Sequence, residues 1–347
     1  MLERYQRSEQ ALIWTLAECY VQGVSIRKVA SICRELFGDE VSHETVSRYA
    51  KRLDEELEPW RTRKLGGRYR YLFLDARYEK GRENQRVVDM AVLVAIGVNE
   101  QGRREVVGTE VAHGESKATW GDFLKGLVDR GLTGVELVVS DAHAGLSDAR
   151  KKHLTGVPWQ RCQRHFLMNA VHQVPKAEEK ALHRALRRVW DDSTSWEQAR
   201  SAMTELARSL EARHPRLAEW LEVEGEETLR CFHFPAHHRK RIRTTNGVER
   251  VNQELKRRSR VVRIFPNRRS CRRRAGRGRR AFGLGPAQPG EQEKRSTDGP
   301  LNSFNRRGLR PPFYRRHLTR HPGGPYSAPD SVPGVFRIRF VPYRFKE

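Results

Sequence analysis

The strongest constraint on the fold is a run of three strand-like segments that begins near residue 69. They span residues 69–76, 86–98 and 104–112. The middle segment is long and rich in Val, Ile and Leu, which pack well in strands. The sequence Asn99-Glu-Gln-Gly, between the second and third segments, is typical of a hairpin turn. The three segments therefore predict an antiparallel sheet.

An amphipathic helix and a wholly apolar strand follow this predicted sheet. The helix spans 116–130, the strand spans 135–140, and a further helix spans 144–154. A strand that is apolar on both faces is typical of a buried parallel position. Three antiparallel strands, a helix and a parallel strand are the order of an RNase H-like fold. We therefore predict an α/β protein with an RNase H-like core, and this fold alone does not assign a function.

Each of two apolar segments ends in an aspartate. Asp75 follows Tyr71-Leu-Phe-Leu, and Asp141 follows Val138-Val-Ser. A carboxylate at the end of a buried strand is costly unless it is paired or binds a metal ion. The alternatives are an aspartate in a turn for Asp75 and a helix cap for Asp141.

A third carboxylate, Glu249, lies in the first turn of a predicted helix. Asn246 as the N-cap, with Glu249 three residues later, resembles a capping box, which requires no catalytic role. The same helical face also carries Asn252 or Gln253 and Lys256, and Lys256 is a predicted DNA contact. Two carboxylates at strand ends and one on a later helix can converge on a pair of Mg²⁺ ions. Such a centre suits the cutting and joining of phosphodiesters.

The charge is strongly positive and unevenly distributed. The 347 residues carry a formal net charge of +24, which favours nucleic acid as a partner. From Arg268 onward there are 20 Lys and Arg against 5 Asp and Glu. The five scattered cysteines indicate no disulfide framework, and a reducing compartment fits them. Without a signal-peptide core or a membrane-length apolar run, we expect a cytoplasmic, nucleoid-associated protein with no membrane partner.

Residues 1–57 predict a helical DNA-binding region. Two amphipathic helices joined by a short turn follow the plan of a helix-turn-helix, whose second helix enters the major groove. Arg48, Lys51 and Arg52 fall on the outer face of that second helix and are predicted to contact DNA. An ordinary helical hairpin is the alternative. A basic linker over 58–68 leads to the sheet.

Residues 163–243 follow a helical pattern throughout and predict an all-helical insertion between the second and third acids. Just before it, Cys162-Gln-Arg-His165 has the spacing of half a zinc site, and Cys231 is one of the residues that could add a ligand. A histidine at the edge of an active site, or a buried structural pair, is the alternative interpretation.

Four motifs occur in this order: Leu-Asp75-Ala-Arg-Tyr-Glu-Lys, Val-Ser-Asp141-Ala-His-Ala-Gly-Leu, Trp159-Gln-Arg-Cys162-Gln-Arg-His165-Phe and Thr-Thr-Asn246-Gly-Val-Glu249-Arg-Val-Asn-Gln-Glu-Leu-Lys256. Together they resemble the Mutator-type transposase family, in its bacterial insertion-sequence branch. The resemblance covers about residues 4–270. It implies an RNase H-like core over 69–162 and 244–267, interrupted by the helical insertion.

The resemblance also implies a DDE transposase that cleaves DNA and transfers the strands of an insertion sequence. Its implied catalytic and metal-binding residues are Asp75, Asp141 and Glu249, which would hold two Mg²⁺ or Mn²⁺ ions. The predicted auxiliary residues are Cys162, His165 and Asn246. The implied partners are the element ends, target DNA and further copies of the chain assembled on DNA.

The sequence from 268 to 347 departs from this pattern. It is basic, rich in Arg, Gly and Pro, and without a helical or strand period, so we predict a disordered tail. Its composition resembles a GC-rich gene read in the wrong frame, which predicts a frameshifted copy with reduced or no activity. Two alternatives therefore stay open: an inactive remnant that occupies element ends, and an RNase H-like nuclease without strand transfer.

Overall fold

The computed structural model describes residues 57–260 and 262–276, together with eight separate residues before them: Cys19, Val24, Lys28, Val29, Ser31, Glu35, Asp54 and Glu55. All of them belong to one compact unit, Met1–Ser296. Most of the predicted DNA-binding region, including Arg48, Lys51 and Arg52, lies outside the described residues. The sequence from 277 onward also lies outside them.

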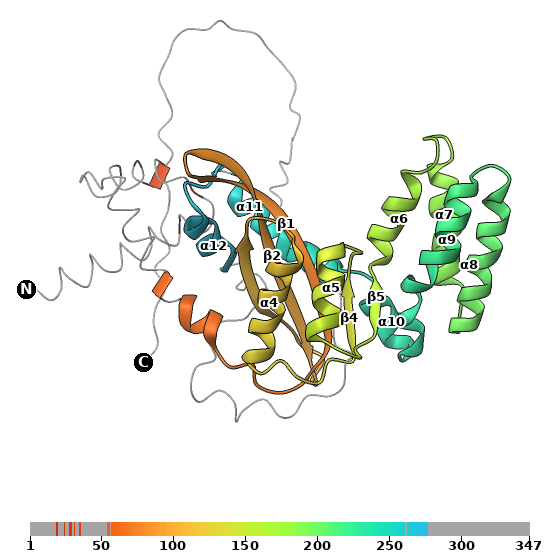
Figure 1. Ribbon diagram of the computed structural model, residues 1–347, viewed down its shortest axis with the longest axis horizontal. Coiled ribbons are helices and arrows are strands. Elements are labelled where there is room, and N and C mark those ends of the chain that lie inside the picture. Colours follow the sequence, from red (N-terminus) through yellow and green to blue (C-terminus); the bar gives the residue numbers. More distant parts are fainter. Residues whose placement is uncertain are drawn as a thin grey trace, which may run out of the picture. The chain divides into compact units, whose positions relative to one another are not determined.

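The described residues contain a five-stranded sheet in the order β3-β2-β1-β4-β5 (Figure 1). Its strands are β1 (Tyr69–Glu83), β2 (Arg86–Asn99), β3 (Arg104–Ala112), β4 (Leu137–Ser140) and β5 (Trp159–Arg161). The first three strands pair antiparallel, whereas β4 pairs parallel with β1, and β5 with β4. The predicted antiparallel strands and the parallel fourth strand are confirmed. The three-residue strand β5 was not predicted, because so short a segment shows no period.

Strand β1 is longer than the sequence predicts. Its pairing with β2 continues from Tyr69 to Glu83, so Asp75 lies inside the strand. The prediction that Asp75 ends the strand is wrong. Burial does stop near Asp75, because Ala76 and Arg77 are already partly exposed. The apolar run in the sequence therefore marked the end of the buried stretch, and an exposed antiparallel ribbon carries the strand further.

Side chains alternate between the two faces of the sheet, and different helices cover each face. The face that includes Leu72 and Leu74 packs against α4 (Lys117–Asp129) and α5 (Ala144–His153) (Figure 1). Both helices were predicted, and α4 begins with a capping box between Ser116 and Thr119. The opposite face, which includes Phe73, packs against helices that come later in the chain.

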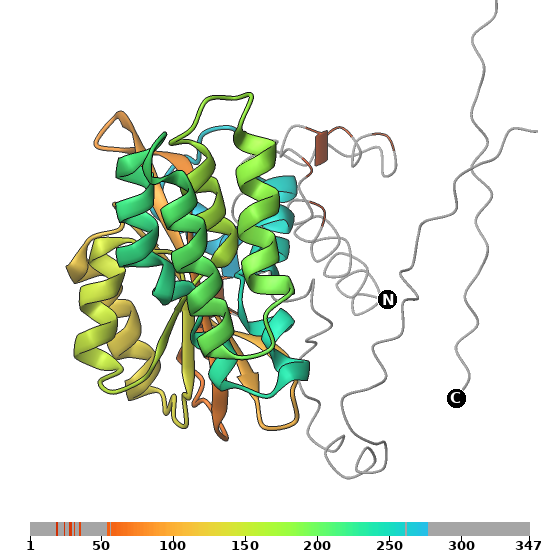
Figure 2. The same cartoon turned by 90° about the vertical axis from the view of Figure 1, so that its right-hand side faces the viewer.

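The predicted helical insertion follows β5 in the chain, and its helices are drawn in green in Figure 2. Its α-helices are α6 (Gln163–Val171), α7 (Glu179–Asp191), α8 (Trp196–Glu211), α9 (Pro215–Glu224) and α10 (Ala236–Ile242), with two 3₁₀ turns between α9 and α10, Gly225–Thr228 and Arg230–His233. Phe166 of α6 is fully buried and stacks on Trp220 of α9, with ring centroids 4.3 Å apart. These residues belong to the apolar cluster that also contains Phe73, so the insertion shares its core with one face of the sheet.

Two helices close the described chain, α11 (Asn246–Ser259) and α12 (Arg268–Gly276). Between them, Phe265 is buried and forms a backbone bridge to Gly81 near the end of β1. Helix α12 contradicts the prediction that disorder begins at residue 268. It buries Cys271 and Ala275 in the apolar cluster of the second face, although its sequence is mostly arginine.

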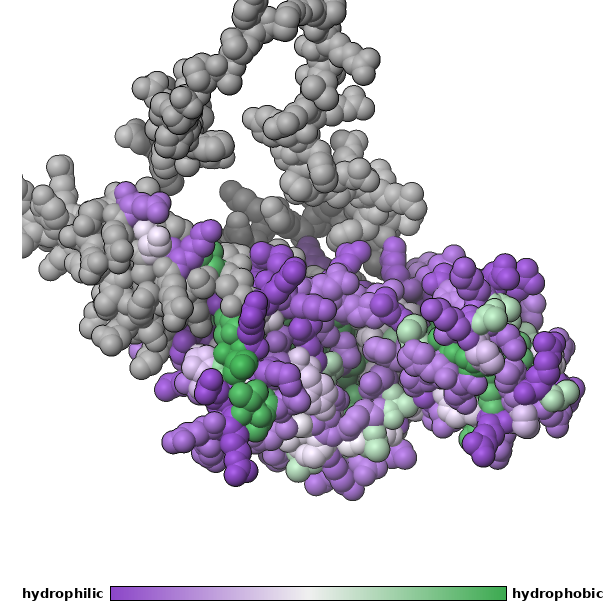
Figure 3. All heavy atoms as spheres, turned by 90° about the horizontal axis from the view of Figure 1, so that it is seen from above, coloured by the Kyte–Doolittle hydropathy of each residue, from purple (hydrophilic) through white to green (hydrophobic). Residues whose placement is uncertain are grey.

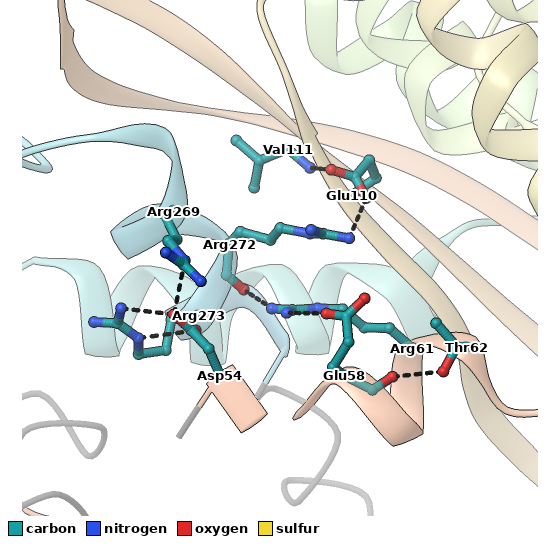
Figure 4. A network of polar contacts seen from close by, with 9 residues as sticks. All are labelled: Asp54, Glu58, Arg61, Thr62, Glu110, Val111, Arg269, Arg272 and Arg273. Carbon is teal, nitrogen blue, oxygen red and sulfur yellow. Dashed lines mark hydrogen bonds and ion pairs between the residues drawn. The ribbon is translucent and has the colours of Figure 1, made fainter. Parts of the chain in front are cut away.

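Ion pairs explain how so basic a helix packs (Figure 4). Arg273 donates to both carboxylate oxygens of Asp54 at 2.8 and 2.9 Å, and Arg272 pairs with Glu110 of β3 at 3.2 Å. The Arg61 guanidinium donates to the carbonyl oxygen of Arg272 at 2.8 Å. The arginines of α12 therefore pair with acidic residues that lie far away in the sequence. The composition of residues 268–276 alone does not reveal these partners.

A chain that ends at Asn267 is expected to be less stable than one that ends at Gly276, by about 2–4 kcal/mol. The shorter chain loses the buried apolar side chains of α12 and leaves Asp54 without its arginine. Thermal melts followed by circular dichroism should show a Tm roughly 5–10 °C lower. Equal melting temperatures for the two truncated chains would contradict the packing role of α12.

The exposed surface is mainly hydrophilic. The face drawn in Figure 3 shows hydrophilic side chains over most of the described residues, with small hydrophobic areas between them. Large exposed apolar side chains are Tyr78, Val87, Val128, Met168 and Val223. Among the described residues, no helix is both long enough and apolar enough to cross a membrane.

Candidate active site

The register of the sheet places Asp75 and Asp141 at the same level of two adjacent strands. The parallel pairing of β1 with β4 matches Phe73 with Val139, and both aspartates lie two residues further along. Asp75 therefore points to the same face as Phe73, the face that packs on α11, and Asp141 is the first residue after the end of β4. Neighbouring strands lie about 4.8 Å apart, so the two carboxylates are close neighbours. Asp141 does not cap α5, whose N-cap is His143.

Helix α11 brings the third acid to this face. Its Val248 and Val251 are buried in the cluster that contains Phe73, and Glu249 between them is 19% exposed. The amide of Asn252, one turn further, donates to Asp75 at 2.8 Å. The predicted capping box is wrong, because Thr245 occupies the N-cap position and Asn246 is the first helical residue.

The environment of Asp75 is unfavourable for its charge. Burial raises the pKa of Asp75 to about 7, and the negative charges of Asp141 and Glu249 add to this shift. The positive charge of His165 opposes the shift without cancelling it. An aspartate that is 8% exposed, with two further carboxylates close by, is the arrangement that a bound cation would relieve.

Cys162 and His165 form a pair beside the aspartates. Cys162 directly follows β5, and its backbone N–H donates to the carbonyl oxygen of Ser140 at 2.7 Å. The neighbouring Cys162 thiol raises the pKa of His165 to about 9, burial of the ring opposes this shift, and the charges of Asp75 and Asp141 add to it. Burial disfavours ionisation of Cys162, but the hydrogen bond and charge of His165 outweigh it and lower the pKa of the thiol. His165 is thus a positive charge at the edge of the acidic site.

The described residues offer no further zinc ligand beside Cys162 and His165. The Cys162 sulfur accepts hydrogen bonds from the backbone N–H and the hydroxyl of Thr245, both at 3.4 Å. The Cys231 sulfur accepts a hydrogen bond from the side-chain amide of Gln163. Within residues 57–260 and 262–276 and the few described before them, no group of three or more His, Cys, Asp or Glu is placed to hold a metal ion.

Glu249 forms an ion pair with an arginine. The Arg164 guanidinium pairs with the Glu249 carboxylate at 2.9 Å. Among the described residues, the three acids are not gathered into a ligand set for a metal ion. Their chemistry nevertheless fits a hard divalent cation, because carboxylate oxygens are its preferred ligands. The buried side-chain amide oxygen of Asn252, on the residue that bonds to Asp75, has no hydrogen-bond partner and is a further oxygen ligand for a cation.

Comparison with known proteins identifies the family. The model of the Mutator family of transposases matches residues 1–277. The chain belongs to the Mutator family of transposases. The chain is 48% identical, over 278 residues, to the transposase for insertion sequence element IS406 of Burkholderia multivorans, covering 78% of this chain and 70% of that protein.

Other transposases are similarly related. The transposase for ISRM5 of Rhizobium meliloti is 46% identical over 273 residues, which cover 79% of this chain and 68% of that protein. The transposase for IS256 in Tn4001 of Staphylococcus aureus is 39% identical over 279 residues, which cover 80% and 71%. The Mutator-family match extends to residue 277 and so includes α12, in agreement with the structure.

In this Mutator-family chain, two charged residues near the acids carry no signal in the sequence. Arg164 lies inside the Cys162 motif, but nothing in the sequence links it to Glu249, 85 positions later. Glu115, before α4, has its pKa raised by burial and by the charge of Asp141. Its place in a polar loop gave no signal. Lys256 was predicted, and it lies exposed on α11, two turns beyond Glu249.

Replacing Cys162 with alanine is expected to lower the pKa of His165 from about 9 toward the value of a free imidazole. The substitution removes the largest cause of the raised value, and burial of the ring, which lowers the pKa, then opposes the remaining contributions of Asp75 and Asp141. A pH titration of the imidazole signals by NMR measures the change. An unchanged titration would show that Cys162 does not interact with the ring.

Proposed function

We propose that the chain is a DDE transposase with an RNase H-like core, in which Asp75, Asp141 and Glu249 form the catalytic triad. The observation that carries this proposal is that Asp75 in β1 and Asp141 directly after β4 follow the paired residues Phe73 and Val139 at the same interval, on strands whose shared face packs against the helix that bears Glu249. The raised pKa of Asp75 supports it, because both other acids contribute to that shift. Strongly perturbed carboxyl groups are typical of functional sites.

The triad would hold two Mg²⁺ or Mn²⁺ ions. When bound, they would activate the attacking hydroxyl and stabilise the entering and leaving oxygens of an in-line displacement at phosphorus. The protein positions the ligands: the Asn252 amide orients Asp75, and β4 fixes Asp141 through the sheet register. His165 supplies a positive charge that limits the repulsion among the acids.

The substrate we propose is DNA, at the element ends and at the target. Mutator-family relatives are named as transposases for insertion sequence elements, which supports this assignment. Lys256 is exposed on the helix that carries Glu249 and is a proposed phosphate contact. The predicted Arg48, Lys51 and Arg52 contacts, assembly into homo-oligomers on DNA and association with the nucleoid remain parts of the same proposal.

The test is a cleavage and strand-transfer assay with DNA that carries the element ends. Asp141→Asn and Glu249→Gln are each expected to reduce both products at least about 100-fold, because each removes an anionic oxygen ligand while keeping the side-chain size. Asp148→Asn, on the exposed surface of α5, is the matched control and should retain wild-type activity.

The products also distinguish the alternatives. Metal-dependent nicking without joined products would replace the transposase assignment with a nuclease. Binding of element ends without any cleavage by the wild-type chain would favour an inactive remnant.

We further propose that this copy has reduced activity because its reading frame has changed. The match to the family model ends at residue 277, so the proposed change lies just beyond α12 and not at Asn267. Translating the other two frames of the gene from the codon after Gly276 tests this. A continuation that encodes amphipathic helices would support a frameshift, and its absence from both frames would refute it.

A further inference from the structure

Arg164 is a mostly exposed residue that pairs with the mostly buried Glu249. It lies in the first turn of α6, its guanidinium pairs with Glu249 at 2.9 Å, and its side chain is 57% exposed whereas that of Glu249 is 19% exposed. Solvent around the exposed guanidinium screens this ion pair and can solvate Arg164 when the pair opens. Arg164 can therefore leave Glu249 for another anion at small cost.

A cavity of about 240 Å³ opens beside this ion pair. Arg164, Arg187 and His183 line it, together with Asn246 at the start of α11. Its lining also includes Arg243 and a single acid, Asp191, and these two residues pair with each other at 2.6 Å. The remaining lining charges are therefore positive, which favours an anionic ligand.

The chemistry of the cavity matches a phosphodiester. Guanidinium groups bind phosphate oxygens through paired hydrogen bonds, and the donors come from two helices, α6 and α7. The cavity adjoins Glu249 through Arg164, so a phosphate bound there belongs to a strand that passes the acidic site.

We propose that this cavity binds a DNA phosphate next to the scissile bond, and that Arg164 then moves from Glu249 to the phosphate. Glu249 is released in this step to join Asp75 and Asp141 as a metal ligand. DNA and the divalent cation thereby bind with positive coupling, since each removes a competitor of the other. This inference rests on the proposed function, because it presumes that the three acids bind metal.

Mn²⁺ binding to the full chain, without DNA, gives the first test. Arg164→Gln is expected to bind Mn²⁺ about threefold to fivefold more tightly than the wild-type chain, because Glu249 loses its competing cation. Arg164→Lys, which keeps the charge, should fall between them. Arg200→Gln is the matched control: Arg200 is 59% exposed and pairs with Glu226 in the insertion, so its removal should leave the affinity unchanged.

The second test measures coupling with a short single-stranded oligonucleotide, followed by fluorescence anisotropy in Ca²⁺ and in EDTA. The wild-type chain should bind the oligonucleotide about threefold to fivefold more tightly in Ca²⁺, and Arg164→Gln should lose this difference. Weaker or unchanged Mn²⁺ binding by Arg164→Gln, or unchanged coupling, would overturn the inference. If the wild-type chain shows no saturable Mn²⁺ binding that Asp141→Asn removes, the proposed function itself fails.

Discussion

Replacing Asp75 with asparagine is expected to abolish DNA cleavage and, at the same time, to stabilise the metal-free protein at pH 8. Asp75 is 8% exposed, and burial together with Asp141 and Glu249 raises its pKa from 3.8 to about 7. Asparagine has nearly the same shape and can still accept the hydrogen bond from Asn252, but it carries no charge. The folded protein therefore no longer has to hold a buried carboxylate.

The pH dependence follows from the direction of this shift. The folded protein binds the Asp75 proton more tightly than the unfolded chain, so ionisation of Asp75 destabilises the fold. This cost is absent below about pH 4, grows as the pH rises through the interval between 3.8 and about 7, and is complete above it. The asparagine variant should gain on the order of 2–4 kcal/mol at pH 8, and the gain should shrink toward pH 5.

Thermal melts in EDTA at pH 5 and pH 8 measure this gain, and melts in Mg²⁺ provide the control. Mg²⁺ should raise the Tm of the wild-type chain at pH 8 but not that of Asp75→Asn, because the variant lacks one of the three carboxylates that would bind the ion. If the variant is inactive but no more stable than the wild-type chain at pH 8, ionisation of Asp75 does not destabilise the fold.

Replacing Phe166 with alanine is expected to destabilise the fold by about 3–5 kcal/mol, the range for a fully buried phenylalanine. Its ring stacks on Trp220 at 4.3 Å, meets Trp190 edge-to-face at 6.2 Å and lies under the Arg161 guanidinium. These contacts join α6 to the rest of the insertion. The Tm should fall by roughly 10 °C.

Phe166→Leu provides the matched control, because it keeps most of the apolar volume and should cost only about 1 kcal/mol. The alanine variant should also disturb the active site, since α6 carries Arg164, which pairs with Glu249, and His165, whose charge interacts with Asp75 and Asp141. Loss of the raised pKa of His165 in Phe166→Ala, measured by NMR, would show this directly. A small change in Tm would contradict the proposed role of the ring in the core.

Local patterns were sufficient for the elements with a strong period. The three antiparallel strands, the apolar β4 and both flanking helices could be predicted because each carries its own alternation of apolar and polar residues. The choice of Asp75, Asp141 and Glu249 also came from local sequence and from the resemblance to the family. Whether these acids bind metal remains a prediction.

Errors arose where a residue's state depends on distant partners. Asp75 was placed at a strand end, but pairing with β2 extends β1 to Glu83. Asn246 was placed at a helix cap, but Thr245 takes that position and also contacts Cys162, 83 positions earlier. Neither partner can be recognised from the sequence around the residue itself.

The sequence by itself determined the α/β class, the first four strands with their flanking helices, the helical insertion and the family, because periodicity and motif are properties of neighbouring residues. Only the tertiary structure decided that Arg164 holds Glu249 and that the arginines of α12 pack against Asp54 and Glu110. A charge is stabilised by whichever opposite charge lies near it in space. In this chain the arginine-rich residues 268–276 fold because their acids are supplied from far along the sequence.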